Sequence, residues 1–196
     1  MSGCTDEKTD DSSDAGDAGN DGTTTSGFIS AKDAWDKVKT AVETWDPDYS
    51  IARVRHFGTN QWAEDLEETS WDFYVESGDG SKSTTFTYSV EDGLSKTTDT
   101  NFGTGRDTFQ ITDWTVDSTQ AAEIAFNAIR ENEFPDFTGG LEAELFADDD
   151  NNPYWTIDYS SRKKDGNYDL SIPLEYGNVQ INAKTGELID ISGDSE

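Results

Sequence analysis

Apolar residues recur at every second position in several separate segments of this chain, and no other feature restricts the fold as strongly. In one such segment, Trp71, Phe73 and Val75 alternate with polar or weakly polar residues. This alternation puts one face of a β-sheet against a core and the other in water, as is typical of antiparallel sheets. Comparable segments, some of them shorter, lie at residues 51–57, 84–90, 109–116, 141–145, 155–159, 170–174 and 179–191.

The first alternating segment contains the chain's only histidine. Strict alternation places Ile51 on one face of this strand with Arg53 and Arg55, and it places Val54 and His56 on the opposite face. The strand is therefore predicted to carry its two arginines on the side of Ile51.

Turns and a bend are predicted where the alternation stops or changes phase. Asp92-Gly93 follows a strand and has the composition of a tight hairpin turn. Between Phe109 and Val116 the apolar positions change phase, which predicts a bulge or bend near Asp113.

Two other segments have helical spacing instead. Ser30 is a predicted N-cap, and an apolar stripe at intervals of three and four residues follows over residues 31–45. Asp117 and Gln120 have the spacing of a capping box in front of a second stripe over residues 121–129.

The order of these elements predicts an α+β fold with two similar halves. Each half contains one helix followed by about five strands. We expect two tandem units, at residues 28–116 and 117–196, each with one helix packed on an antiparallel sheet of about four or five strands.

The second unit resembles the PepSY domain family in the closing run "VQINAKTGELIDI". Val179 and Ile181 alternate in this run, Asn182 follows, and Thr185-Gly186 supplies the turn before a short last strand. The resemblance covers roughly residues 118–191, and the first unit fits the pattern more loosely. It implies an extracytoplasmic, non-catalytic domain of the kind found in peptidase propeptides and envelope proteins, which binds proteins and in some cases inhibits peptidases.

The N-terminal segment contains the chain's only cysteine. Cys4 follows Ser2-Gly3 and precedes a run of Asp, Gly, Ser and Thr that extends to residue 27. That run has almost no apolar surface to bury, so residues 1–27 are predicted to form a disordered acidic tether. The small-small-Cys sequence before a polar tether resembles the end of a lipoprotein signal sequence, in which Cys4 would carry the lipid. The chain departs from that pattern because no hydrophobic stretch precedes the motif.

Charge excludes one class of partner. Asp and Glu number 42 against 14 Lys and Arg, so the net charge is −28. Such a surface repels phosphate backbones, and no direct nucleic-acid binding is expected. The acids are spread along the whole chain, which favours a halophilic surface suited to high salt over one meant for cations or basic partners.

Candidate reactive and metal-binding residues have plainer alternatives. No nucleophile signature accompanies His56, so a structural or surface histidine is the favoured reading over a general base. Asp148, Asp149 and Asp150 offer oxygen ligands suited to Ca²⁺, but the run lacks the loop glycine and distal Glu of an EF-hand. A solvated hairpin loop is the preferred interpretation, a weak Ca²⁺ site is the alternative, and no other metal site or cofactor is predicted.

Two aromatic residues are the predicted partner contacts. Trp62 lies in a polar segment and Tyr154 lies opposite Trp155 in its strand. Exposed aromatic side chains frequently anchor partners, although for Trp62 the favoured reading is that it covers a sheet edge. The remaining tryptophans fit core-facing positions: Trp35, Trp45, Trp71, Trp114 and Trp155.

Together these features predict a non-catalytic, extracytoplasmic lipoprotein that is anchored to the membrane at the cell surface and binds a protein. The partner would be an envelope or secreted protein, for example a peptidase that this chain inhibits or regulates. One alternative is an envelope module that binds cations or a surface polymer through its acids. Another is a hydrolase with an unrecognised carboxylate site.

Overall fold

The computed structural model describes residues 28–56, 66–164, 167–168, 170–171 and 173–195. Its helices are α1 (Ala31–Trp45) and α2 (Ser118–Asn132), and a short 3₁₀ helix, η1, spans Ile111–Asp113. The strands are β1 (Ser50–His56), β2 (Ser70–Glu76), β3 (Ser83–Ser89), β4 (Gly93–Lys96), β5 (Gly140–Ala147), β6 (Pro153–Ser160), β7 (Lys163–Lys164), β8 (Asn167–Tyr168), β9 (Glu175–Asn182) and β10 (Leu188–Ser195).

Both helices begin where the sequence predicts. The Ser30 side chain accepts a hydrogen bond from the Asp33 backbone N–H at the start of α1. At the start of α2, Asp117 and Gln120 form the complete capping box. Local sequence therefore determines both helix N-termini.

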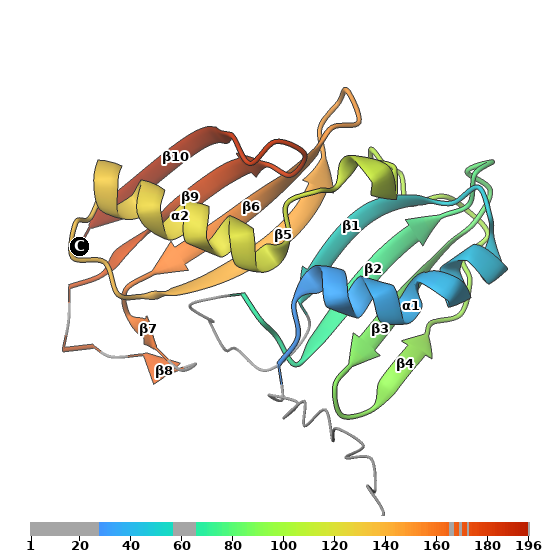
Figure 1. Ribbon diagram of the computed structural model, residues 1–196, viewed down its shortest axis with the longest axis horizontal. Coiled ribbons are helices and arrows are strands. Elements are labelled where there is room, and N and C mark those ends of the chain that lie inside the picture. The colour runs from blue at the N-terminus through green and yellow to red at the C-terminus, as the bar shows by residue number, and fades with distance from the viewer. Residues whose placement is uncertain (1–27, 57–65, 165–166, 169, 172, 196) are drawn as a thin grey trace, which may run out of the picture.

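Eight strands form one antiparallel sheet in the order β10-β9-β6-β5-β1-β2-β3-β4. At its centre β1 pairs with β5, with Val54 opposite Leu145 and Arg55 opposite Glu144. The strands that follow α1 occupy one half of the sheet, and those that follow α2 occupy the other. Both helices lie across the same face (Figure 1). We call this the covered face, and the opposite one the open face.

One row of apolar side chains crosses six strands on the covered face. Strand register places its members opposite one another: Phe86, Phe73, Val54, Leu145, Trp155 and Ile181. All six are buried, and they belong to a single cluster that extends under both helices. Helices and sheet thus share one hydrophobic core, to which this row belongs.

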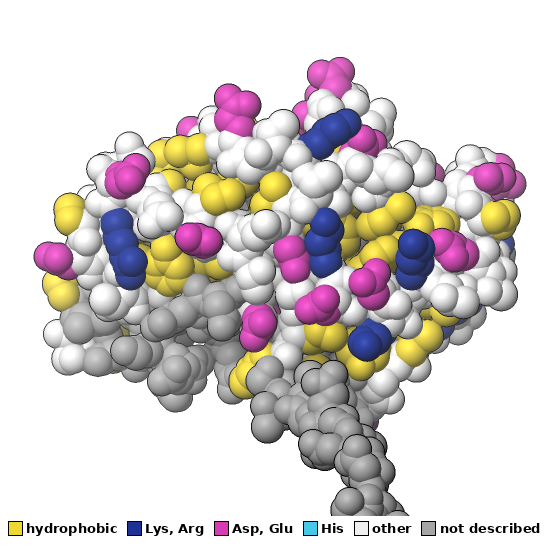
Figure 2. Space-filling view, viewed as in Figure 1, with side chains coloured by type: hydrophobic (Ala, Val, Ile, Leu, Met, Phe, Trp, Pro, Cys, Tyr) yellow, Lys and Arg dark blue, Asp and Glu magenta, His cyan; other side chains and the backbone are white. Residues whose placement is uncertain are grey.

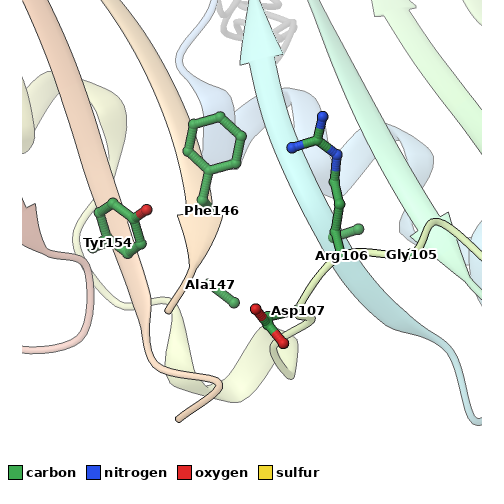
Figure 3. Close-up of a pocket in the computed structure, with 7 residues that line it drawn as sticks. Gly105, Arg106, Asp107, Phe146, Ala147 and Tyr154 are labelled. Carbon is green, nitrogen blue, oxygen red and sulfur yellow. The ribbon is translucent and has the colours of Figure 1, made fainter. Parts of the chain in front are cut away.

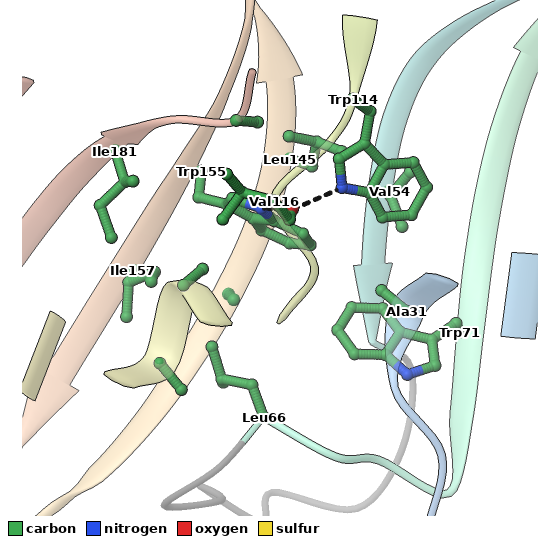
Figure 4. Packing of buried hydrophobic residues seen from close by; sticks show 14 of the residues in the cluster. Ala31, Val54, Leu66, Trp71, Trp114, Val116, Leu145, Trp155, Ile157 and Ile181 are labelled. Carbon is green, nitrogen blue, oxygen red and sulfur yellow. Dashed lines mark hydrogen bonds between the residues drawn. The ribbon is translucent and has the colours of Figure 1, made fainter. Parts of the chain in front are cut away.

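Three tryptophans meet in the middle of this cluster (Figure 4). The Trp155 ring centroid lies 6.3 Å from that of Trp71 and 6.0 Å from that of Trp114, edge to face in both cases. The indole N–H groups of Trp114 and Trp155 both donate to the Val116 carbonyl oxygen, at 2.8 Å. These buried donors are thus satisfied, as a close-packed core requires.

The N-termini of the two helices meet between the halves. The Asp117 carboxylate accepts hydrogen bonds from the backbone N–H of Ser118 in α2 and of Lys32 in α1. The Ser118 hydroxyl accepts another from the Ala31 backbone N–H. Residues at the start of α2 therefore satisfy N–H groups at the start of both helices.

The prediction that Ile51 shares a face of β1 with Arg53 and Arg55 is wrong. The register shifts between Ile51 and Arg53, which is a bulge at Ala52. The extra residue turns Ile51 to the covered face with Val54, and both are fully buried. The arginines remain on the open face, without Ile51.

The predictions for 109–116 and 170–174 are also wrong in part. Phe109 makes only an isolated bridge with Ile51, and the bend near Asp113 is the 3₁₀ helix η1. In the segment 170–174, Leu170 lies in a turn and its side chain is 78% exposed, and residues 173–174 lie outside any strand. The predicted hairpin turn before Gly93 is confirmed, since β3 pairs with β4 across it and Gly93 has φ +75°.

The α+β class is confirmed, whereas the division into two tandem units is not. Two units with a sheet each would leave two separate sheets, but the strands after α1 and after α2 join through β1 and β5. One buried cluster spans both halves as well.

Candidate functional site

The open face carries a second row of side chains, each one residue away in sequence from a member of the buried row. Register places this row across the same six strands: Thr87, Asp72, Arg55, Glu144, Thr156 and Gln180. No helix in the described part of the chain packs on this side (Figure 1). The polar half of the predicted alternation is thus displayed on one surface.

Arginine and aromatic side chains alternate along the middle of this face. Arg53 Cζ lies 5.6 Å from the Tyr74 ring centroid and 5.2 Å from that of Phe146. Arg55 Cζ lies 5.3 Å from Tyr74, and Arg106 Cζ lies 6.0 Å from Phe146. These distances are those of cation–π contacts. We call the five residues the arginine–aromatic ladder.

Carboxylates neutralise two of the three guanidinium groups in the ladder. Arg53 forms an ion pair with Glu144, and Arg55 Nε lies 3.9 Å from Asp72 Oδ2. The Thr87 hydroxyl also donates to Asp72 Oδ1, at 2.5 Å. The hydrogen-bonded pair with Glu144 holds Arg53 in place on the sheet, whereas the contact of Arg55 with Asp72 exceeds hydrogen-bond length.

The third arginine is different. Among the residues that the structure describes, no carboxylate lies within 4.0 Å of the Arg106 guanidinium, although the chain has 42 acids. Arg106 is exposed, and its nearest recorded side-chain contact is the Phe146 ring. Arg106 is therefore the member of the ladder whose charge is available to a ligand.

The loop that carries Arg106 is fixed on both sides. The backbone N–H and hydroxyl of Thr104 both donate to Glu76 Oε2. Gly105 has φ +66°, a left-handed conformation that favours glycine. Downstream, Phe109 exchanges two backbone hydrogen bonds with Ile51. These attachments position Arg106 beside the sheet, although it lies outside any strand.

A pocket of about 410 Å³ lies at the end of the ladder (Figure 3). Its lining comes from β1, from the 105–107 loop and from both strands of the β5–β6 hairpin: Ala52, Gly105, Arg106, Asp107, Phe146, Ala147 and Tyr154. In the close-up, the labelled side chains of Tyr154, Phe146, Arg106 and Asp107 surround the hollow. The pocket combines two aromatic rings, one cation and one anion, and its volume suits a small ligand or a few side chains of a partner.

His56 lies near the opposite end of the ladder, between two carboxylates. Its Nδ1 is 3.7 Å from Glu68 Oε1 and its Nε2 is 3.8 Å from Glu142 Oε1. These contacts favour the charged ring, but both exceed hydrogen-bond length, and neither ring nitrogen has a hydrogen-bond partner among the described residues. Burial is the largest influence and lowers the pKa of His56. The negative charge of Glu144 acts to raise this pKa, and the positive charge of Arg55 lowers it further. The neutral ring packs edge-on against Trp71, which agrees with a structural role.

One of the predicted partner contacts lies at the pocket. Tyr154 lines it, with its ring centroid 6.3 Å from that of Phe146. Trp62 and Cys4 lie outside the described residues. The roles predicted for Tyr154, Trp62 and Cys4 stay predictions.

The acidic run 148–150 forms the turn between β5 and β6. Desolvation raises the pKa of Asp148, but hydrogen bonds that Oδ1 accepts from the backbone N–H groups of Asn152 and Asp150 prevail and lower it. In the described ranges, no three His, Cys, Asp or Glu residues gather in a way that could hold a metal ion. A weak Ca²⁺ site at Asp148, Asp149 and Asp150 thus gains no support from the geometry.

A larger hollow, of about 600 Å³, lies on the covered side between α1 and the edge strand β4. We call it the apolar groove, and its lining includes Lys37, Ala41, Trp45, Phe86, Leu94 and Lys96. Figure 2 shows hydrophobic side chains exposed on this side of the molecule, beside Lys and Arg side chains. Lys96 already pairs with Asp99. The remaining lining residues are Thr40, Thr44 and Ser95. The open-face pocket, in contrast, combines aromatic rings with an arginine and an aspartate, so we place the candidate site there.

Of the residues that line the pocket, only Tyr154 is predicted as a site residue from the sequence. Phe146 and Arg106 were not predicted as site residues. The sequence does contain a signal for Phe146. Leu141, Ala143 and Leu145 point to one face of this strand, so Phe146 is a large apolar residue on the opposite, polar face. Arg106 lies in a loop without periodicity, and no pattern marks it.

The described helices include none that is both long enough and apolar enough to cross a membrane.

Comparison with known proteins gives little further information. No protein-family model matches the chain, and no curated protein matches it. Among solved structures, the chain is similar to a "putative lipoprotein" from Clostridium difficile 630, with 14% sequence identity and a TM-score of 0.49 over 85% of this chain and 93% of that one. A likeness of this size carries no argument about function, and the PepSY resemblance stays a prediction.

Proposed function

We propose that this chain is a lipid-anchored, extracytoplasmic, non-catalytic binding protein, and that it holds its partner on the open face at the Arg106–Phe146–Tyr154 pocket. One observation carries the proposal. Three of the five arginines of a strongly acidic chain lie at the sheet face on which no described helix packs, stacked on aromatic rings beside a pocket.

Arginine and tyrosine are, with tryptophan, the residue types enriched among the side chains that contribute most at protein interfaces. Here the pair with Glu144 holds Arg53 in place before a partner arrives, and the Tyr74 ring lies against both Arg53 and Arg55. Less side-chain entropy is then lost on binding. A preformed surface of this kind favours binding over chemistry.

The anchor in this proposal is Cys4, and its support comes from the sequence. The cysteine follows two small residues and precedes a long polar segment. Mass spectrometry of the native protein should find a lipid on Cys4, and an unmodified thiol would contradict the anchor while leaving the binding surface untouched.

We also propose that the two halves are related PepSY-like units whose sheets have joined at β1 and β5. The strand order supports this, because each helix is followed by strands that make up one half of the sheet. A peptidase as the partner follows from this resemblance alone.

Affinity capture from native membranes tests the binding surface. The full chain and two variants, Tyr154→Ala and Leu94→Ala, serve as bait, and captured proteins are quantified by mass spectrometry. Tyr154→Ala removes a wall of the pocket, and Leu94→Ala removes an exposed side chain from the apolar groove. A specific partner should disappear with Tyr154→Ala and remain with Leu94→Ala, and the reverse pattern would place binding in the groove. Trp62→Ala tests its predicted contact in the same way.

A further inference from the structure

The pocket contains one cation, Arg106, that forms no ion pair with any residue the structure describes, Asp107 of the same pocket included. The carboxylate partners of Arg53 and Arg55 leave Arg106 as the unpaired guanidinium of the ladder, as judged over the described residues. The Phe146 ring supports this guanidinium on one side, at 6.0 Å from Cζ. An anion that reaches it would meet a cation already held near its binding position.

The shape of the guanidinium restricts the anion. Its planar fork of N–H donors matches the two oxygens of a carboxylate, which it can bind through two parallel hydrogen bonds. The Phe146 and Tyr154 rings provide an apolar surface beside the fork, where a hydrophobic neighbour of that carboxylate can pack.

The surrounding charge favours a monoanion. Asp107 lines the same pocket, and the whole chain carries −28. A phosphate dianion would be repelled more strongly by both than a singly charged carboxylate. Asp107 also offers an acceptor for an N–H donor of the ligand, such as a peptide amide.

We propose that the pocket recognises a peptide carboxylate next to a hydrophobic side chain, with the carboxylate on Arg106, a backbone N–H on Asp107 and the hydrophobic group packed against the paired rings of Phe146 and Tyr154. This inference rests on the proposed function, since it names what part of the protein partner enters the pocket.

Two short peptides that differ only in the charged group test it directly. The probes are acetyl-Ala-Phe-Glu-amide and acetyl-Ala-Phe-Gln-amide, titrated into the ¹⁵N-labelled full chain and followed by NMR. The Glu peptide should shift the amide signals of residues 105–107 and 146–147 with saturation. Loss of a charge-assisted hydrogen bond should weaken the Gln peptide by roughly tenfold.

Variants identify the cation responsible. Arg106→Gln should reduce the affinity for the Glu peptide to that for the Gln peptide, and Arg106→Lys should recover part of it, because the charge returns without the fork. Lys37→Gln removes the same charge from the rim of the apolar groove and should change nothing. Equal binding of the two peptides, no saturable binding at millimolar concentration, or an unchanged Glu affinity in Arg106→Gln would each overturn the inference.

The membrane capture separates this inference from the proposed function. If the partner is lost with Tyr154→Ala but kept with Arg106→Gln, the open face binds it without a carboxylate, and the inference alone fails. If the partner is kept with both variants, the proposed function fails as well.

Discussion

The two faces of the central sheet use the same six strands in different ways. The buried row and the open row run side by side, so that Trp155 and Thr156, or Leu145 and Glu144, are neighbours in sequence but lie on opposite faces. On the covered face the side chains exclude water beneath two helices. On the open face, arginines pair with carboxylates and stack on aromatic rings.

The difference separates stability from recognition. Contacts on the covered face are close-packed, and removing one leaves a cavity that the core cannot refill. Contacts on the open face remain partly accessible to water, so they contribute less to folding and can be exchanged for contacts with a ligand. Substitutions on the two faces should differ accordingly in their effect.

The largest effect is expected from Trp155→Ala. The side chain is fully buried, donates to the Val116 carbonyl and contacts the rings of Trp71 and Trp114. Its truncation should lower the free energy of unfolding by about 3–5 kcal/mol in urea titrations. Thr156→Ala, one residue away on the open face, should change it by less than about 0.5 kcal/mol. Similar losses in both variants would remove the distinction between the faces.

An intermediate effect is expected from Arg53→Ala. The substitution removes two cation–π contacts and leaves Glu144 without its ion-pair partner, and these side chains are 18% and 29% exposed. We expect a loss of about 1–2 kcal/mol in the same titrations. The double variant with Glu144→Ala should lose less than the sum of the two single variants, because no unpaired charge remains. Strict additivity would show that the pair contributes nothing.

The smallest expected effect is a change in the stability of the fold with pH, caused by the titration of His56. Burial lowers the pKa of His56 in the folded chain below the ordinary value of 6.5, which the unfolded chain retains. Between these two values the unfolded chain binds more protons, so stability is complete above pH 6.5 and falls as the pH drops toward the folded-state pKa. Thermal melts at pH 7.5 and 5.5 should show this loss, and His56→Gln should reduce it. An undiminished loss in His56→Gln would assign it to the carboxylates.

Much of the fold could be predicted because local signals determine it. The cap at Ser30 and the capping box at Asp117 mark both helices, and alternation correctly separates the faces of β2 and β6. The bulge at Ala52 could not be predicted, because one extra residue changes the face of Ile51 without changing the composition of the strand. The pairing of β1 with β5 could not be predicted either, since it joins segments about 90 residues apart in sequence.

Only one residue of the pocket could be predicted from the sequence, because the pocket is built from segments that are distant in sequence. Tyr154 stood out as an aromatic residue on the polar side of a strand. Its neighbours in the pocket come from β1, from a loop and from β5, and only the folded sheet brings them together. Arg106 in particular depends on the attachment of its loop to Glu76, which involves a contact 28 residues away.

The shared junction of the helix N-termini has a consequence for the order in which the chain folds. Backbone N–H groups of Ala31 and Lys32 find their acceptors on Ser118 and Asp117, which lie 85 to 87 residues later. A chain emerging from the ribosome or a translocation channel therefore presents α1 with these donors unmatched until the second half arrives. The first half should gain protection from proteases only after residue 118 has emerged, which makes α1 a late reporter of completed folding rather than an early nucleus.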